Sequence, residues 1–255
     1  MNNSGYVAGR IRLTAKRYFA PAEQIQFPFI TLKGREHHHL TRVIRIQRGE
    51  TIEVFDGRGN YHSARVERID SSTTKLRIVK SYSENKPRFK LILAPALIKP
   101  KSMDLMLQKA TELGASCISP VLAERSVVKL ERNIQKKITR WEKIVLSAAK
   151  QSGRAYLPKI ENPVPLARFL KDKAGGTGLC LYQHEQNLLK DILTESSPSK
   201  EGVFLLVGPE GDWTDPEKKN IVQHGFRMAS LGPKTLRSET AAIFGLAIIF
   251  HFWMI

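Results

Sequence analysis

The chain has 255 residues, 42% of them hydrophobic and 25% charged, which predicts a globular protein of one or two domains with a sizeable core. Its longest apolar stretch, residues 241–250, is too short to span a bilayer and is better interpreted as a buried helix. The formal net charge of +17 favours a polyanionic partner, nucleic acid ahead of an anionic membrane, although a merely basic surface would carry the same total.

Residues 16–85 are expected to form short strands, as in a small barrel. The segment 51–69 alternates apolar and polar residues and breaks at Asp56-Gly57, which predicts a hairpin. Another strand is predicted within 75–82, and the polar, proline-containing segment 83–89 follows it. We therefore expect a domain boundary near residue 86. The denser positive charge lies before it, because residues 1–87 hold 16 Lys and Arg against 8 Asp and Glu.

Strands and helices alternate from residue 89 onward, which predicts a parallel sheet with helices on both faces. The predicted strands lie at 89–97, 115–122, 178–182, 202–207 and 228–231. The predicted helices lie at 101–114, 133–153 and 214–226, and a last, apolar helix ends the chain.

Only two cysteines occur, Cys117 and Cys180, each in an apolar run. Buried thiols in a reducing compartment are expected, because disulfides persist mainly in oxidising ones. The sequence has no CxxC pair and no apolar secretion signal at its N-terminus, so neither a zinc site nor export is expected. The predicted location is the cytoplasm.

A Gly-Pro loop, Gly208–Gly211, follows the strand predicted at 202–207. In open α/β sheets, ligands bind beyond the carboxyl ends of the strands, where this loop lies. The loop lacks both the Walker and the dinucleotide-binding patterns, and Glu210 and Asp212 would repel phosphate. It therefore suits a ligand that is neutral or cationic nearby, or it is a plain structural turn before a helix with a capping box at Thr214–Glu217.

A second such loop begins at Gly232-Pro233 and leads to Arg237 and Glu239 at the start of the apolar helix. Charged side chains at the start of an otherwise apolar helix cost free energy unless they form ion pairs or contact a ligand. One interpretation is a helix-capping Glu with an Arg salt bridge. The other is that the two loops face each other across a crevice in which Arg237 and Glu239 act.

The sequences of these loops are "LLVGPEG" (205–211) and "SLGPKTLRSETAA" (230–242). Together they resemble the C-terminal signature of the SPOUT-class RNA methyltransferases, in particular the RsmE family of 16S rRNA uridine N3-methyltransferases. The resemblance covers nearly the whole chain, including "KRYF" (16–19), "HHHLTRVIRIQRGE" (37–50), "VFDGRGNYHSARV" (54–66), "KATELGASCISPVLAERSVVK" (109–129) and "WEKIVLSAAKQSGR" (141–154).

The resemblance implies a PUA-like β-barrel RNA-binding domain over 1–86 and a SPOUT methyltransferase domain over 87–255, with a C-terminal trefoil knot. It implies a homodimer that uses S-adenosylmethionine. No metal is expected, and no membrane partner either, because neither end of the chain has a basic amphipathic helix. The reaction would be methylation of N3 of a uridine, position 1498 in the usual numbering, in 16S rRNA of the small ribosomal subunit. The cofactor-binding residues carried over are Val207, Gly208, Pro209, Gly211, Ser230, Leu231, Gly232, Leu236, Arg237 and Thr240.

Uracil N3 bears a proton and is a poor nucleophile until that proton leaves, so the reaction needs a base or a positive group. Arg237 is predicted to stabilise the uracil anion, and Glu239 to take the proton or to orient Arg237. Two departures from the family pattern bear on this site. Asp212 stands where the family usually has the second glycine of GPEGG, and Lys150 stands where it tends to have Glu.

Basic residues of the N-terminal part are the main candidates for RNA contacts. Arg42, Arg45 and Arg48 follow one another at a spacing that would form one stripe on a helix. A solvated charged face is the alternative. The RNA-binding candidates are Lys16, Arg17, Arg42, Arg45, Arg48, Arg58, Gln151 and Arg154.

His37, His38 and His39 are adjacent, so they cannot share one face of a helix or strand, and a surface turn or RNA contact is favoured over a metal site. Aromatic residues nearby could stack bases, although core packing is the more common use of Tyr18, Phe19 and Tyr61. Two other functions stay open: a methylase of another RNA position or of tRNA, and an RNA-binding or assembly protein without catalysis, which Asp212 keeps possible.

Overall fold

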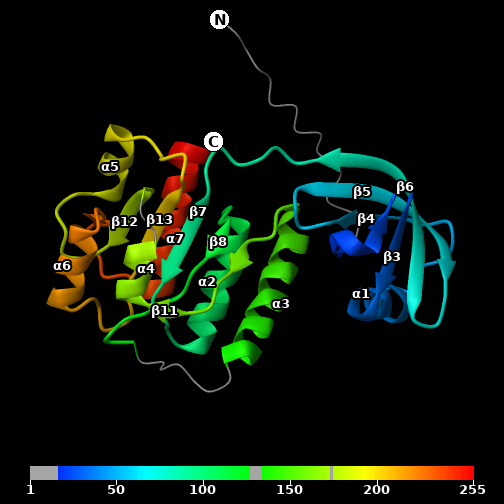
Figure 1. The fold of residues 1–255 in the computed structure, drawn as a ribbon, viewed down its shortest axis with the longest axis horizontal. Coiled ribbons are helices and arrows are strands. Elements are labelled where there is room, and N and C mark those ends of the chain that lie inside the picture. The colour runs from blue at the N-terminus through cyan, green and yellow to red at the C-terminus, as the bar shows by residue number, and fades with distance from the viewer. Residues whose placement is uncertain (1–16, 127–133, 173–174) are drawn as a thin grey trace, which may run out of the picture. The chain divides into compact units, whose positions relative to one another are not determined.

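The computed structural model describes residues 17–126, 134–172 and 175–255, and these form two compact units. One unit contains the described residues up to Glu84 together with Gly153–Tyr156, and the other contains Asn85–Ser152 and Leu157–Ile255 (Figure 1). Segment 153–156 therefore groups with the N-terminal unit, although it lies far along the chain. The domain boundary after residue 86 stays a prediction.

The first unit is built on a curled six-stranded sheet with the order β1-β4-β5-β6-β3-β2. Strand β1 is parallel to β4 and the other neighbours are antiparallel. The inward side chains alternate with outward ones and include Tyr18, Leu32, Val54, Val66 and Leu76. The elements are β1 (Arg17–Phe19), η1 (Ala22–Gln24), β2 (Ile25–Gln26), β3 (Phe29–Lys33), α1 (Gly34–His38), η2 (His39–Val43), β4 (Thr51–Phe55), β5 (Asn60–Ile69) and β6 (Thr73–Ser83).

The predicted hairpin is confirmed: β4 and β5 pair through a turn in which Gly57 and Gly59 have φ of 76° and 101°. The Asp56 carboxylate closes this turn by accepting the backbone N–H groups of Arg58, at 2.7 Å, and Asn60, at 3.0 Å. Short polar side chains of this kind stabilise turns because they replace a backbone hydrogen-bond partner.

The predicted helical stripe of arginines is wrong. The π-helical turn η2 ends at Val43, Arg45 lies in the left-handed region with φ of 57°, and Arg48 follows in a loop. A left-handed residue cannot continue a right-handed helix, so Arg42, Arg45 and Arg48 are exposed without sharing one helical face.

The second unit contains a six-stranded, wholly parallel sheet with the order β10-β8-β7-β13-β12-β14, as predicted. Beside it lies a short two-stranded sheet of β9 and β11. The strands are β7 (Leu91–Pro95), β8 (Cys117–Ile118), β9 (Val121–Leu122), β10 (Lys159–Ile160), β11 (Val164–Pro165), β12 (Thr177–Leu181), β13 (Val203–Val207) and β14 (Arg227–Ala229).

Residues 115–122 were predicted as one strand, and this is wrong. Strand β8 ends at Ile118 and β9 begins at Val121, and the two strands belong to different sheets. Pro120 lies between them and has no backbone N–H to donate to a neighbouring strand, so the chain leaves the six-stranded parallel sheet there.

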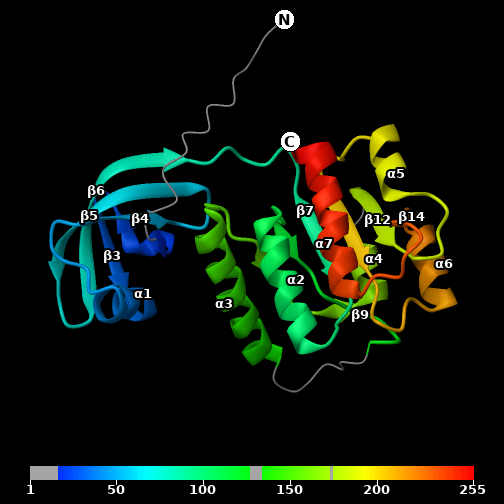
Figure 2. The ribbon, with the colours of Figure 1, turned by 180° about the vertical axis from the view of Figure 1, so that it is seen from behind.

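Helices cover both faces of the large sheet (Figures 1 and 2). One core joins β13 residues such as Leu205 to α2, α3, α5 and α7. The other joins alternate β13 residues such as Leu206 to α4 and α6. These helices are α2 (Pro100–Glu112), α3 (Ile134–Ser152), α4 (Leu166–Asp172), α5 (Leu189–Glu195), α6 (Asp215–Gln223) and α7 (Ser238–Ile249), followed by the π-helical turn η3 (Phe250–Met254).

Several local expectations hold in this unit. Gly114 ends the α2 region with φ of 91°, and Thr214 and Glu217 form the predicted capping box of α6. Helices α4 and α5 were not predicted; each has only seven residues. The trefoil knot stays a prediction.

Both cysteines are free thiols; Cys180 is buried and Cys117 is half-buried. Burial raises the pKa of the Cys180 thiol above its usual value, because a thiolate would lose its hydration there. No helix within the described residues is both long enough and apolar enough to cross a membrane.

Candidate active site

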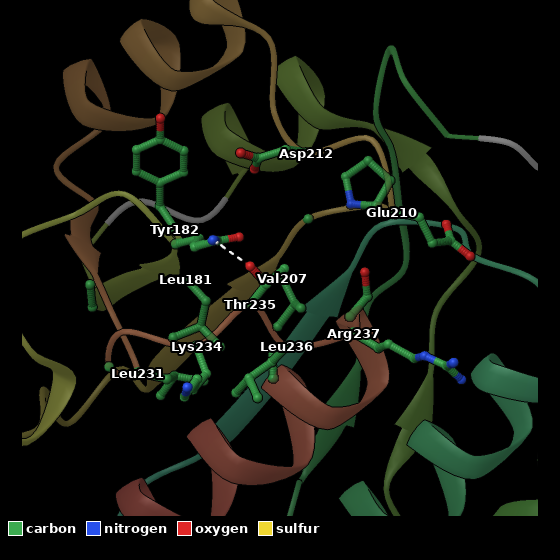
Figure 3. Close-up of a pocket in the computed structure, with 17 residues that line it drawn as sticks. Leu181, Tyr182, Val207, Glu210, Asp212, Leu231, Lys234, Thr235, Leu236 and Arg237 are labelled. Carbon is green, nitrogen blue, oxygen red and sulfur yellow. Dashed lines mark hydrogen bonds between the residues drawn. The ribbon is translucent and has the colours of Figure 1, made fainter.

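A cavity of about 310 Å³ lies at the carboxyl ends of three neighbouring strands of the second unit, β13, β12 and β14. Strand β12 lies between the other two, so three loops converge on the cavity (Figure 3). This is the edge of a parallel sheet at which ligands bind. Its walls are apolar where Leu181, Val207, Leu231 and Leu236 line it.

The loop after β13 is packed so tightly that its glycines cannot be exchanged freely. A Cβ atom on Gly208 would lie 3.1 Å from Nε1 of the buried Trp213, and one on Gly211 would lie 3.1 Å from Cβ of Arg125. The guanidinium of Arg125 also donates to the carbonyl oxygen of Gly211 at 3.1 Å. These contacts hold the loop in one shape.

Asp212 adopts the left-handed backbone conformation, with φ of 60°, at the position where the sequence departs from the family pattern. Asp and Asn tolerate this region better than most residues. The Asp212 carboxylate accepts the backbone N–H of Trp213 at 2.8 Å, and the Asp212 N–H is 3.0 Å from the carbonyl oxygen of Pro209. The loop therefore takes a shape that normally favours glycine, and it does so with a carboxylate on the cavity wall.

The loop after β14 is shaped by Ser230 and Gly232. Gly232 has φ of 119°, which a residue with a side chain rarely adopts. The Ser230 hydroxyl accepts the N–H of Gly232 at 3.2 Å, and Ser230 is almost fully buried. Ser230 thus holds the loop by hydrogen bonds without lining the cavity, whereas Gly232 lines it.

The third loop, after β12, was not predicted as part of the site. It contributes Tyr182 and Gln183 to the cavity wall, next to Leu181 at the end of β12. The Gln183 side-chain amide donates to Oγ1 of Thr235 at 2.6 Å, which joins this loop to the one after β14 (Figure 3).

Tyr182 is fixed in turn by Lys218 of α6. The Lys218 ammonium lies 4.7 Å from the centre of the Tyr182 ring and donates to its hydroxyl at 3.2 Å. The hydrogen bond of Lys218 to Asp215, and next the one to Tyr182, raises the pKa of Lys218 above its usual value. The aromatic ring on the cavity wall is therefore held by a charged partner that stays protonated.

Two acidic and two basic side chains line the cavity: Glu210, Asp212, Lys234 and Arg237. A Glu210 carboxylate oxygen accepts the backbone N–H of Lys99 at 3.4 Å, at the start of α2. Arg237 is exposed at the N-terminal cap of α7, and in Figure 3 it extends to the same side as Glu210, away from Tyr182 and Asp212. Such a cavity suits a ligand with a flat apolar part and charges of both signs, and it is a poor site for a polyphosphate.

Seven of the predicted cofactor residues line the cavity: Val207, Gly208, Pro209, Leu231, Gly232, Leu236 and Arg237. Gly211, Ser230 and Thr240 are not among the lining residues, and neither is Glu239, which is half-buried in the first turn of α7. The roles predicted for these four residues stay predictions. The lining residues that were not among the predicted cofactor-binding residues are Leu181, Tyr182, Gln183, Glu210, Asp212, Ala229, Lys234, Thr235, Ser238 and Ala241.

The RNA-binding candidates differ in their exposure to solvent. Lys16 lies outside the described residues, and Arg42, Arg45, Arg58 and Gln151 are exposed. Arg17 is instead almost buried in an ion pair with Glu53, and it donates to the carbonyl oxygen of Arg154 at 3.3 Å. Desolvation lowers the pKa of the partly buried Arg154 below its usual value. Arg17 thus has a structural role within the first unit, and the backbone of Arg154 supplies one of its partners.

The histidine cluster is divided by burial. His37 is buried, and its Nδ1 lies 2.8 Å from Oγ1 of Thr74, so the expected surface turn is wrong for this residue. His38 and His39 are exposed. Within the described ranges, no group of three His, Cys, Asp or Glu side chains is arranged to hold a metal ion. Tyr18 is fully buried, as core packing requires, and Tyr61 stacks on Tyr82 with ring centres 5.1 Å apart.

The sequence profile of a family described as an RNA methyltransferase domain matches residues 84–250. A second profile, described as an RNA methyltransferase PUA domain, matches residues 32–79. Among curated proteins, the ribosomal RNA small subunit methyltransferase E of Synechocystis is 34% identical over 239 residues, which cover 92% of this chain and 77% of the relative.

Two solved structures are similar over almost their full length. The ribosomal RNA small subunit methyltransferase E of Neisseria gonorrhoeae, bound to S-adenosylmethionine, has a TM-score of 0.84 and 29% identity, and the match covers 94% of this chain and 98% of that one. A putative methyltransferase of Legionella pneumophila, in complex with the same cofactor, has a TM-score of 0.84 and 31% identity, with 93% and 97% covered.

Proposed function

The chain belongs to the RNA methyltransferase family, and we propose that it transfers a methyl group from S-adenosylmethionine to N3 of a uridine in 16S rRNA of the small ribosomal subunit. Position 1498 is the target that the family implies. The observation that carries the proposal is the cavity in which two Gly-Pro loops and the end of β12 converge. In this proposal, residues 1–86 are the PUA-like RNA-binding domain and 87–255 the knotted SPOUT domain, in the cytoplasm.

The residues of the cavity fit S-adenosylmethionine, which supplies an electrophilic methyl group on a sulfonium sulfur. The apolar walls formed by Leu181, Val207, Leu231 and Leu236 suit its adenine ring. The carboxylates of Glu210 and Asp212 suit its positive charges, and would be out of place against a phosphate. Glycine at Gly208 and Gly211, where a Cβ would be tightly packed, lets the loop backbone approach a ligand closely.

Arg237 is proposed as the catalytic cation. It lines the cavity at the N-terminus of α7, where the helix dipole adds positive potential. A guanidinium there would stabilise the negative charge that develops on the uracil when its N3 proton leaves. Glu239 is proposed to accept that proton or to orient Arg237, and this role needs a change of side-chain position, since Glu239 does not line the cavity.

The conformation of Asp212 bears on the alternative of a protein without catalysis. Because Asp212 adopts positive φ and its carboxylate binds the next N–H group, the Gly-Pro loop keeps a shape that glycine would give it. This favours an enzyme over an RNA-binding protein that has lost activity. A methylase of another RNA position remains the second candidate.

We further propose a homodimer. The apolar helix α7 and the turn η3 carry Phe244 and Phe252, whose exposed fractions are 45% and 44%. Ile248 lies between them at a spacing of four residues and is half-buried, so the three side chains form an apolar strip along one side. Exposed strips of this kind mark protein interfaces. Sedimentation equilibrium, which measures mass in solution, checks this proposal.

The function is tested by incubating the protein with labelled S-adenosylmethionine and small ribosomal subunits from a strain lacking this gene, followed by nucleoside mass spectrometry. We expect 3-methyluridine at one site. Another methylated nucleoside would keep the methylase and reject the target. Cofactor binding without transfer to subunits, naked rRNA or tRNA would instead favour the non-catalytic protein.

A further inference from the structure

The outer face of the first unit's sheet carries basic residues directly opposite one another. In the register of β5 and β6, Arg65 is paired with Arg77 and Arg68 is paired with Lys75. Like charges in directly opposed cross-strand positions destabilise a sheet. The repulsion within these two neighbouring pairs therefore lowers the stability of the free protein, and an anion bound between them would relieve the repulsion.

The acidic side chains on this face neutralise only part of the charge. Glu67 forms an ion pair with Arg77, and Asp70 forms one with Arg68 at 2.6 Å. Within the described part of the chain, Arg65 has no acidic partner, so the face keeps a net positive charge.

Phe29 of the adjacent strand β3 holds two of the cations above the sheet. It lies opposite Arg77 in the register of β3 and β6. Its ring centre is 3.9 Å from the Lys75 ammonium nitrogen and 4.9 Å from the central guanidinium carbon of Arg77. Cation–π contacts of this kind hold the charged groups in place. Because Lys75 and Arg77 lie against the Phe29 ring, this ring is not free to stack on a base.

The loop before β4 adds a further wall. The Gly49 N–H is 2.9 Å from the carbonyl oxygen of Val66, and the Val66 N–H is 2.8 Å from the carbonyl oxygen of Glu50. These bonds fasten the loop to β5 and place the exposed Arg48 beside it. The result is a groove of about 520 Å³, which we call the barrel groove, lined by Arg48, Gly49, Arg65, Val66, Glu67, Arg68 and Lys75.

We propose that the barrel groove binds the phosphate backbone of the rRNA substrate. The inference rests on the proposed function, and it names a contact surface for the substrate on the unit that does not contain the cofactor cavity. A concave row of cations matches a phosphodiester backbone, which enters a groove as a flat lipid surface cannot. The contact is with phosphates, because the aromatic ring is covered, so it positions the RNA and does not read its sequence.

The test compares three full-length variants by their affinity for small ribosomal subunits at several salt concentrations. The groove variant is Arg48→Gln/Arg65→Gln/Lys75→Gln. The matched control, Lys171→Gln/Lys190→Gln/Lys219→Gln, removes the same charge from exposed sites on α4, α5 and α6 of the second unit. A third variant, Arg48→Lys/Arg65→Lys/Lys75→Arg, keeps the charge of the groove.

The groove variant should bind subunits about 10–100-fold more weakly at physiological salt, and its salt slope should fall by about two, as expected for three lost phosphate contacts. The control and the charge-keeping variant should stay close to wild type. The thermal midpoint of the groove variant should rise or stay level, since both like-charge pairs are removed. S-adenosylmethionine affinity, measured by calorimetry, reports whether the second unit is intact.

Equal binding by the groove variant and wild type would overturn the inference, as would an equal loss in the control, which would mean that only total charge matters. Both outcomes leave the proposed function standing as long as wild type methylates the subunits. If wild type neither binds nor methylates rRNA, the proposed function fails and the inference fails with it.

Discussion

Gln183 and Thr235 join two loops that are more than fifty residues apart in the chain, through a hydrogen bond of 2.6 Å from Nε2 of Gln183 to Oγ1 of Thr235. Both residues line the cavity at the ends of β12 and β14. The bond links the two strand ends across the opening, so it orders the cavity before a ligand arrives. Ordering of this kind raises affinity because less freedom is lost on binding.

Replacement of Gln183 by Ala should therefore weaken S-adenosylmethionine binding about fivefold to tenfold, which corresponds to roughly 1 kcal/mol for one lost hydrogen bond. The free energy of unfolding should change little, because both side chains are exposed. Isothermal calorimetry gives the affinity. Gln186→Ala is the matched control on the same loop, and an equal loss of affinity there would show that the bond itself is unimportant.

Asp212 allows its backbone and charge effects to be separated. Asp212→Ala should lower the free energy of unfolding by about 2 kcal/mol, because Ala is strained at positive φ and cannot accept the Trp213 N–H. Asp212→Asn keeps the acceptor and the tolerance of positive φ, so its stability should lie within about 0.5 kcal/mol of wild type.

The charge effect then appears in binding. Asp212→Asn should weaken S-adenosylmethionine binding severalfold if the carboxylate attracts the positive charge of the ligand, and raised salt should reduce the difference. Urea denaturation and calorimetry on the same samples measure the two quantities. Unchanged affinity would remove electrostatics from the role of Asp212, and an Ala variant as stable as wild type would contradict the strain argument.

The two thiols should react at very different rates with an alkylating or disulfide reagent. Cys180 is buried, and its raised pKa keeps it protonated, whereas Cys117 is half-buried. The thiolate is the reactive form, so Cys117 should react first and Cys180 only when the sheet opens or unfolds. Raising the pH to about 9 should leave the labelling of Cys180 slow, because its raised pKa keeps the thiol protonated. Peptide mass spectrometry assigns the label, and rapid native labelling of Cys180 would refute the prediction.

The predictable parts of the site are those in which a strand, a turn and a helix follow one another directly in the sequence. The Gly-Pro loops were found because an apolar run, a glycine and a helix start follow one another in the chain, as at Val207 and Gly208. The loop of Tyr182 and Gln183 was missed because its role depends on β12 lying between β13 and β14, an order that long-range pairing sets. No local pattern encodes that order.

The partner of Arg17 could not be predicted for the same reason. Arg17 was named as a candidate RNA contact because it lies in the densely basic N-terminal part, and arginine side chains are mostly exposed. In the structure, the parallel register of β1 and β4 places Arg17 opposite Glu53, and the two side chains form an almost buried ion pair. His37 is a parallel case, since Thr74 of a distant strand supplies its hydrogen-bond partner. Both partners could be identified only once the strands were paired.

Arg237 carries the sharpest prediction about catalysis. Arg237→Ala should lower kcat about 100-fold, the usual effect of removing one group that stabilises a developing anion, which amounts to about 2.7 kcal/mol. S-adenosylmethionine affinity should fall by less than tenfold, because the apolar walls and loop backbone remain. Raising the pH should recover part of the lost rate, since uracil then gives up its N3 proton without help. Single-turnover methyl transfer on small subunits measures the rate constant of the methyl-transfer step itself, without product release, and should show the same decrease.

Lys234→Ala is the matched control for Arg237, because Lys234 is an exposed cation on the same loop and lines the same cavity. It should keep kcat within a few-fold of wild type, since it does not stand at the N-terminus of α7. Arg237→Lys should restore part of the rate by keeping the charge, but not all of it, because an ammonium lacks the planar fork of a guanidinium. Full turnover by Arg237→Ala with unchanged cofactor affinity would remove Arg237 from the mechanism, and the positive end of α7 would then be the remaining candidate for stabilising the uracil anion.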